Sequence, residues 1–170
     1  MKRSLVPGLQ RARKSVEAQK GDSAPRQASS ADAALLRRYI TTWESGDLDA
    51  FTALLADDVL LSMPPQPEWF AGREAVRGFL ASLLTVDPRR YRLLPLAANG
   101  GPAVAVYRRR MPSNAAYEAA AIILLVMRGG RVSQMTRFTF PRLSPLFGLP
   151  QLLQGVSGRA RRSGGRSPLR

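Results

Sequence analysis

Three acidic residues are the candidates for proton-transfer chemistry in this sequence: Asp58, Glu68 and Glu118. A carboxyl group serves as a general acid or base near neutral pH when an apolar site raises its pKa and a second titratable group stands nearby. Asp58 follows another aspartate, Glu68 lies in a proline-rich stretch, and Glu118 lies near an expected strand edge. These settings are more typical of solvated or capping acids, so we expect no catalytic residue.

Histidine and cysteine are both absent from the chain. Their absence excludes Ser-His-Asp and Cys-His catalysis, thiolate metal sites and disulfide frameworks. The acidic residues also lack the spacing of a calcium-binding loop. We therefore expect no metal and no cofactor, and a non-enzymatic function is favoured over an enzymatic one.

Large apolar side chains could line a ligand pocket or form a docking surface, although helix and strand aromatics more often fill an ordinary core. The pair Trp69-Phe70 differs, because it lies in an expected loop between Pro67 and Gly72. A large apolar pair in a loop is typical of a pocket rim or a docking surface. The candidates for such a site are Trp43, Met63, Trp69, Phe70, Tyr107 and Phe138.

The elements that must position these residues follow from apolar spacing and turn signals. Leu35, Tyr39 and Trp43 recur every four residues, which predicts a helix that Gly46 ends. A shorter helix over residues 48–55 and a third that opens at Gly72 follow the same logic. Strand-length runs cover residues 59–63, 91–98, 103–109, 117–127 and 132–140.

Turn residues separate the last four of these strands, so we expect them to pair as an antiparallel meander. Helices first and strands afterwards predict an α+β fold, with three helices packed on one face of an antiparallel sheet. The apolar segment 143–149 holds a proline and a glycine, and we expect it to form an irregular lid.

The formal net charge of +14 lies mostly in the two ends of the chain. We expect a flexible basic arm and linker at 1–30, one domain at 31–150 and a disordered basic tail at 151–170. Charge in such tails implies at most non-specific, salt-sensitive contact with DNA or another polyanion. The longest apolar run, Ala119 to Met127, is too short to span a bilayer, so we expect no membrane partner and a cytoplasmic protein.

Four stretches of the chain match one known pattern in the same order. The first to stand out runs from Ser62-Met63-Pro64-Pro65 through Glu68-Trp69-Phe70 to Gly72-Arg73. The others run from Arg38 to Asp47, from Leu93 to Tyr107 and from Pro141 to Pro150. Together they resemble the SnoaL-like domain that ends certain extracytoplasmic-function sigma factors. The resemblance covers about residues 31–150 and implies a cone-shaped SnoaL-like, nuclear transport factor 2-like fold with a curved sheet.

The segment from Ser4 to Arg13 resembles the end of the DNA-binding helix of sigma region 4. The resemblance implies a sigma factor without its front part, which would not direct initiation by itself. One departure from the pattern is Phe140, which stands where relatives seem to carry an acid, so a role for that carboxylate does not carry over. The tail from Leu152 on also runs past the end of the pattern.

These observations favour a regulatory or interaction domain that modulates transcription initiation through contacts with sigma factor regions or RNA polymerase. The alternative is a protein that binds a small apolar ligand, or an isomerase-like or cyclase-like enzyme, in the pocket that such folds enclose. A truncated gene product without a function of its own and a homodimer through the open sheet face also stay open.

Overall fold

Helix α2 (Ser30–Ser45) begins and ends where its capping residues dictate. The side chain of Ser29 accepts a hydrogen bond from the backbone N–H of Asp32, and the Asp32 carboxylate accepts one from the N–H of Ser29, which forms a capping box. Gly46 closes the helix in the left-handed conformation, at φ 71°. The predicted apolar face is confirmed, because Leu35, Tyr39 and Trp43 are its buried residues. The computed structural model describes residues 29–84, 90–109, 116–139 and 141–154.

Two further α-helices, α3 (Leu48–Thr52) and α4 (Arg73–Leu84), lie within these ranges. Asp47 caps α3 by accepting a hydrogen bond from the N–H of Ala50 at 2.9 Å. Helix α3 ends three residues before the predicted limit, because the chain turns there and enters the first strand at Leu55. Three helices were expected, and the described part of the chain has three α-helices and one 3-10 helix.

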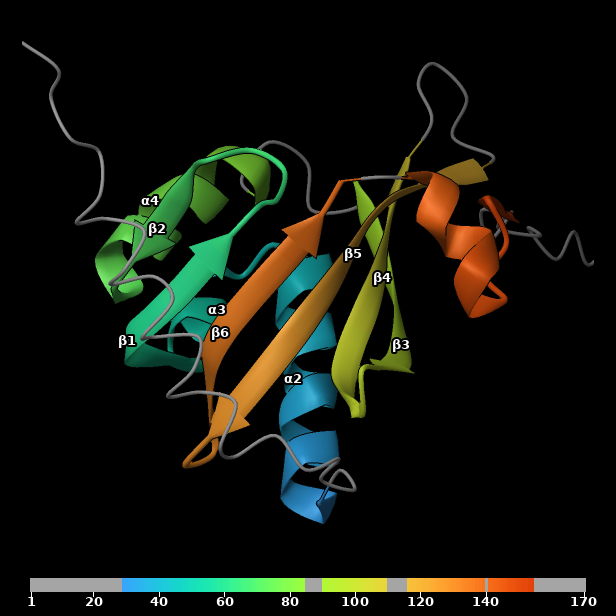
Figure 1. Cartoon of the computed structure of the whole chain (residues 1–170). Coiled ribbons are helices and arrows are strands. Elements are labelled where there is room, and N and C mark those ends of the chain that lie inside the picture. Colours follow the sequence, from blue (N-terminus) through green and yellow to red (C-terminus); the bar gives the residue numbers. More distant parts are fainter. Residues whose placement is uncertain (1–28, 85–89, 110–115, 140, 155–170) are drawn as a thin grey trace, which may run out of the picture.

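A seven-stranded sheet forms the other layer (Figure 1). Six strands follow the order β2-β1-β6-β5-β4-β3, and β7 pairs with β5 beyond the end of β6. The strands are β1 (Leu55–Ser62), β2 (Trp69–Ala71), β3 (Tyr91–Ala98), β4 (Gly101–Arg109), β5 (Ala116–Arg128), β6 (Arg131–Phe138) and β7 (Leu152–Gln154).

The meander from β3 to β6 is antiparallel, as predicted, but the sheet as a whole is mixed. Strand β1 pairs parallel with β6, with Leu61 opposite Met135. A parallel pair needs a long crossover connection, and here that connection consists of β2, α4 and the strands β3 to β5. The prediction of a purely antiparallel sheet was therefore wrong at this one pairing.

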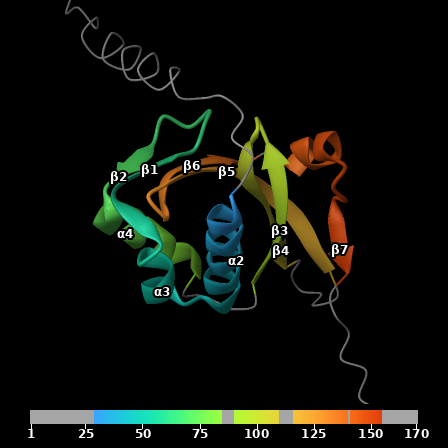
Figure 2. The same ribbon diagram turned by 90° about the horizontal axis from the view of Figure 1, so that it is seen from below.

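The sheet is curved, and its concave face wraps around α2 (Figure 2). Side chains alternate between the two faces along each strand. On β4, Val104 and Val106 belong to the large core that the three α-helices cover, whereas Ala105 and Tyr107 belong to a smaller cluster with residues of β5. Two apolar clusters on opposite faces of one sheet are the result.

The C-terminal segment covers the smaller cluster. Residues Pro141–Phe147 form a 3-10 helix, and Leu149 and Leu153 pack against the cluster of Ala105 and Tyr107. This segment is the predicted lid, and it includes a strand, β7, beyond the domain limit expected at residue 150. The predicted arm at 1–28 and the tail from residue 155 lie outside the described residues. In the described ranges, no helix is long and apolar enough to cross a membrane.

Gly72 supplies a testable link between sequence and fold. Its φ of +87° precedes α4, and a Cβ there would meet only the Asp57 carbonyl oxygen at 3.8 Å. Space is sufficient, so Gly72→Ala should cost about 1–2 kcal/mol from the conformation alone. Gly78 lies inside α4, where a Cβ would have nothing within 4 Å. Gly78→Ala should therefore stabilise the protein by about 0.5–1 kcal/mol in a denaturant titration, and equal effects of the two substitutions would contradict this account.

Candidate functional site

Trp43 lies at the centre of an aromatic group on the concave face. Its ring centroid is 5.7 Å from that of Tyr39, 5.4 Å from that of Phe51 and 6.3 Å from that of Tyr91. Only 2% of Trp43 is exposed to solvent. The side chain fills the space between α2, α3 and β3.

Three other candidates from the sequence lie apart from Trp43. Met63 is buried directly after β1, and Phe138 is half-buried at the end of β6. Tyr107 is buried on the opposite face of the sheet, where its hydroxyl donates a 2.7 Å hydrogen bond to the carbonyl oxygen of Pro150. Burial raises the pKa of Tyr107. The predicted residues are thus distributed over both faces.

Trp69 and Phe70 lie in strand β2 and not in a loop, which corrects the prediction. Ser62 pairs with Trp69 and Leu61 pairs with Phe70, so two backbone pairings turn this stretch into the edge strand of the sheet. Phe70 stacks on Phe79 of α4 with ring centroids 4.7 Å apart. Trp69 is 68% exposed, which is unusual for so large an apolar side chain.

The concave interior holds three hydrogen-bond donors that lack a strong acceptor. The indole Nε1 of Trp43 and the Nε of Arg137 are buried without a partner. The hydroxyl of Tyr39 donates only to the Met135 sulfur, at 3.6 Å, and a thioether is a weak acceptor. Buried donors are normally paired, and each unpaired one costs about 1–3 kcal/mol. These three donors are the chemical feature that sequence reasoning missed.

Arg137 is the charged member of this group. It stands opposite Ile123 in the β5–β6 register, and Ile123 belongs to the core, so Arg137 projects from the concave face. Burial lowers the pKa of Arg137, while the nearby Tyr91 and Tyr39 hydroxyls oppose that shift. The alternation of Met135 and Arg137 in the predicted strand was the signal that could have placed this guanidinium on the inner face.

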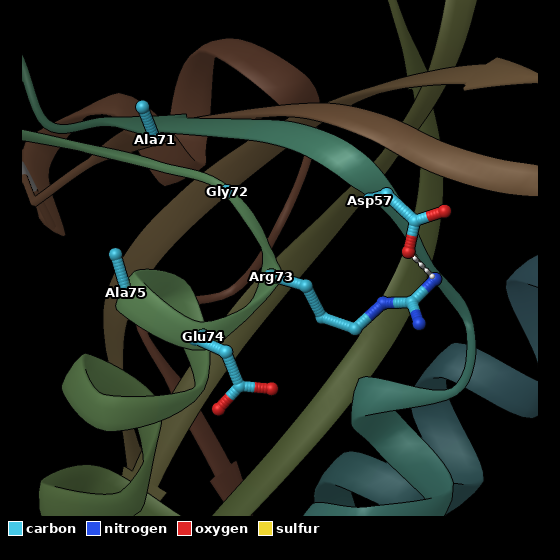
Figure 3. A pocket seen from close by; sticks show the side chains of 6 residues that line it. All are labelled: Asp57, Ala71, Gly72, Arg73, Glu74 and Ala75. Atoms are coloured by element: carbon cyan, nitrogen blue, oxygen red, sulfur yellow. Dashed lines mark ion pairs between the residues drawn. The ribbon is translucent and has the colours of Figure 1, made fainter.

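A separate surface hollow of about 370 Å³ lies at the start of α4 (Figure 3). Arg73 reaches across it to Asp57, with its Nη2 2.8 Å from the Asp57 Oδ1, and also donates to the carbonyl oxygen of Leu55 at 2.8 Å. The lining residues are Asp57, Ala71, Gly72, Arg73, Glu74 and Ala75. None of the six candidate residues lines this hollow. Its two central charges already neutralise each other.

Comparison with known proteins decides the family. Residues 36–135 match the model of the SnoaL-like domain, which is more than half of the chain. The chain belongs to the SnoaL-like family. The fold and the resemblance that the sequence motifs suggested are thereby confirmed at the level of the family.

This SnoaL-like domain is also similar to curated full-length proteins. It is 33% identical over 149 residues to the ECF RNA polymerase sigma factor SigG of Mycobacterium tuberculosis, in two strains. The match covers 85% of this chain and 40% of the relative. The chain therefore spans less than half of the length of the curated relatives that it matches.

Solved structures support the fold of the SnoaL-like domain. A de novo designed protein with a curved β-sheet superposes with a TM-score of 0.54 at 14% identity, over 72% of this chain and 95% of the design. An NTF2-like protein of unknown function from Mesorhizobium loti superposes with a TM-score of 0.53 at 17% identity, over 69% of this chain and 97% of that protein. At these identities the likeness concerns the curved α+β architecture alone.

The three acids considered for catalysis do not lie in the apolar core of the SnoaL-like domain. Asp58 is exposed and forms an ion pair with Arg128 at 2.7 Å. Glu68 is exposed, and Glu118 is half-buried in β5. In the described ranges no group of three or more His, Cys, Asp or Glu side chains could hold a metal ion.

Tyr39 makes the stability of the SnoaL-like domain sensitive to alkaline pH. Burial raises its pKa well above the ordinary value of about 10, and the nearby Arg137 only partly opposes this shift. Above about pH 10 the unfolded chain loses the phenol proton while the folded chain retains it, so stability falls as pH rises. Tyr39→Phe should flatten this decline in denaturant titrations between about pH 9 and 11. An unchanged slope in the variant would show that other groups cause it.

Proposed function

We propose that this chain is a regulatory domain that modulates transcription initiation through contacts with sigma factor regions or RNA polymerase, without directing initiation alone. The observation that carries the proposal is the 33% identity over 149 residues to a sigma factor. Because the chain spans 40% of that relative, the proposal concerns protein contacts by this domain and not the activity of the whole relative.

The surface around Trp69 supports a contact function. Strand β2 is an outer strand of the sheet, and Trp69 presents an indole that is 68% exposed. Stacking on Phe79 holds the neighbouring Phe70 in place. Exposed aromatic side chains on a rigid element are enriched at protein interfaces, where they contribute much of the binding energy. We propose that Trp69 and Phe70 form the docking surface.

Binding to purified components tests this proposal. The intact chain should bind isolated sigma regions 2 and 4 or core polymerase, and Trp69→Ala should weaken that binding by about tenfold or more. Val126→Ala is the matched control, because Val126 of β5 is 49% exposed and lies outside the proposed surface. Since the chain carries a net charge of +14, binding is measured at low and at moderate salt. No binding to any component at either salt concentration overturns the proposal.

Ligand binding is the second candidate function. The unpaired donors of Trp43 and Arg137 favour it, because each can accept a partner without displacing an existing strong hydrogen bond. The isomerase or cyclase alternative gains no such support, since Asp58 and Glu68 are exposed. A bound small molecule would itself be a means to regulate the protein contacts proposed above.

A further inference from the structure

Arg137 is a guanidinium in an apolar setting without a carboxylate. Its cross-strand neighbour Ile123 and the adjacent Met135 both belong to the core of the concave face. The Nε is buried and has no hydrogen-bond partner. In the part of the chain that the structure describes, each of the ion pairs formed by arginines uses a different residue: Arg73, Arg77, Arg92 or Arg128.

The groups that face Arg137 do not neutralise its charge. The electrostatic neighbours that act on it are the hydroxyls of Tyr91 and Tyr39 and the positive charge of Arg108. Glu118 stands opposite Arg108 in the β4–β5 register, but it has an interaction of its own and is not among the groups that act on Arg137. A half-buried cation beside a second cation favours the binding of an anion.

Tyr39 and Trp43 add neutral donors to the same cluster. Tyr39 is in electrostatic contact with Arg137, and its ring lies 5.7 Å from that of Trp43. The Tyr39 hydroxyl has only the Met135 sulfur as acceptor, and the Trp43 Nε1 has none. A guanidinium, a phenol and an indole therefore all lack a strong acceptor in one interior cluster.

We propose that this interior binds a small organic acid, with Arg137 holding the carboxylate and Tyr39 donating a hydrogen bond to it. This inference rests on the second candidate function, ligand binding, and names its ligand class. A carboxylate matches the planar fork of a guanidinium, which can donate two parallel hydrogen bonds to it. The rings of Tyr39, Tyr91 and Trp43 suit an apolar or aromatic body, which distinguishes an organic acid from inorganic phosphate or sulfate.

Benzoate is the probe, and benzamide is its neutral counterpart of the same shape. In the intact chain with Trp69→Phe, Trp43 is the remaining tryptophan and reports on the interior by fluorescence. Benzoate should change this fluorescence saturably and raise the melting temperature, and benzamide should bind at least about tenfold more weakly. Inorganic phosphate at equal ionic strength should not compete.

Variants then assign the binding to Arg137. Arg137→Met should weaken benzoate binding by about tenfold or more, since a charge-assisted hydrogen bond is lost. Arg128→Met should leave binding unchanged, because Arg128 is exposed and pairs with Asp58. Should Arg137→Met fail to fold, the side-chain ¹⁵Nε–¹H resonance of Arg137 in the unsubstituted chain must shift on addition of benzoate.

Several outcomes overturn the inference. One is a lack of saturable benzoate binding, and another is equal binding by benzoate and phosphate. Equal affinity in Arg137→Met and Arg128→Met also contradicts it. Binding of a neutral steroid without binding of benzoate overturns the acidic ligand class while ligand binding itself survives, so the two failures can be distinguished.

Discussion

Replacing Trp43 by alanine is expected to lower the free energy of unfolding by about 3–5 kcal/mol, the range typical of a buried tryptophan truncated to alanine. Trp43 is 2% exposed and contacts the rings of Tyr39, Phe51 and Tyr91. Its loss leaves a cavity that three rigid elements surround, and such a site collapses poorly. A urea titration followed by circular dichroism measures the effect.

Trp69→Ala is the control for that result. The chain has two tryptophans, and Trp69 is 68% exposed on the short strand β2. Its truncation should change the free energy of unfolding by no more than about 0.5 kcal/mol. If Trp43→Ala proved as mild as Trp69→Ala, the side chain of Trp43 would line an open cavity in solution and would not fill the core.

Tyr107→Ala is expected to have the second large effect, about 3 kcal/mol or more, and to act on a different part of the molecule. Tyr107 is fully buried in the smaller cluster, and its hydroxyl holds the carbonyl oxygen of Pro150 at 2.7 Å. Truncation removes both the ring packing and this tie to the C-terminal segment. Amide hydrogen exchange of residues 149–154 should accelerate more than that of α2.

Tyr107→Phe separates the two contributions. The ring stays in the cluster while the hydrogen bond to Pro150 is lost, so the cost should fall to about 1 kcal/mol. The same cost for Tyr107→Phe and Tyr107→Ala would mean that ring packing contributes little. Uniform acceleration of exchange over the whole chain in Tyr107→Ala would mean that the C-terminal segment does not open separately.

Much of the fold follows from local sequence signals. The spacing of Leu35, Tyr39 and Trp43 predicted the buried face of α2, and the glycine turns predicted the meander from β3 to β6. These elements are encoded by residues close together in the chain, where helix period and turn chemistry act directly. The strand Tyr91–Ala98 has the predicted limits for this reason.

The elements that sequence reasoning missed depend on distant partners. Strand β2 has only three residues, and its pairing with β1 across Pro64-Pro65 makes it a strand. The parallel pairing of β1 with β6 likewise has no local signal, because its partners meet only after the meander has formed. Strand β7 pairs with the start of β5 because β6 ends before reaching it.

The candidate site was predicted by residue type and only partly by position. Large aromatics drew attention to Trp43 and Tyr107, but the sequence did not reveal that they lie on opposite faces of the sheet. Arg137 drew no attention, because an arginine in a strand usually faces solvent. Its inward placement follows from its register with Ile123, which is a property of the folded sheet.

The pairing of β1 with β6 also shapes how the chain acquires its structure. Ser62 and Thr136 meet although 74 positions separate them along the backbone. Long-range pairings of this kind slow folding, because the ends of a long loop must find each other before the contact rewards them. During synthesis, β1 therefore waits with an open edge until β6 has left the ribosome, and a chain that stops short of β6 exposes that edge to other strands.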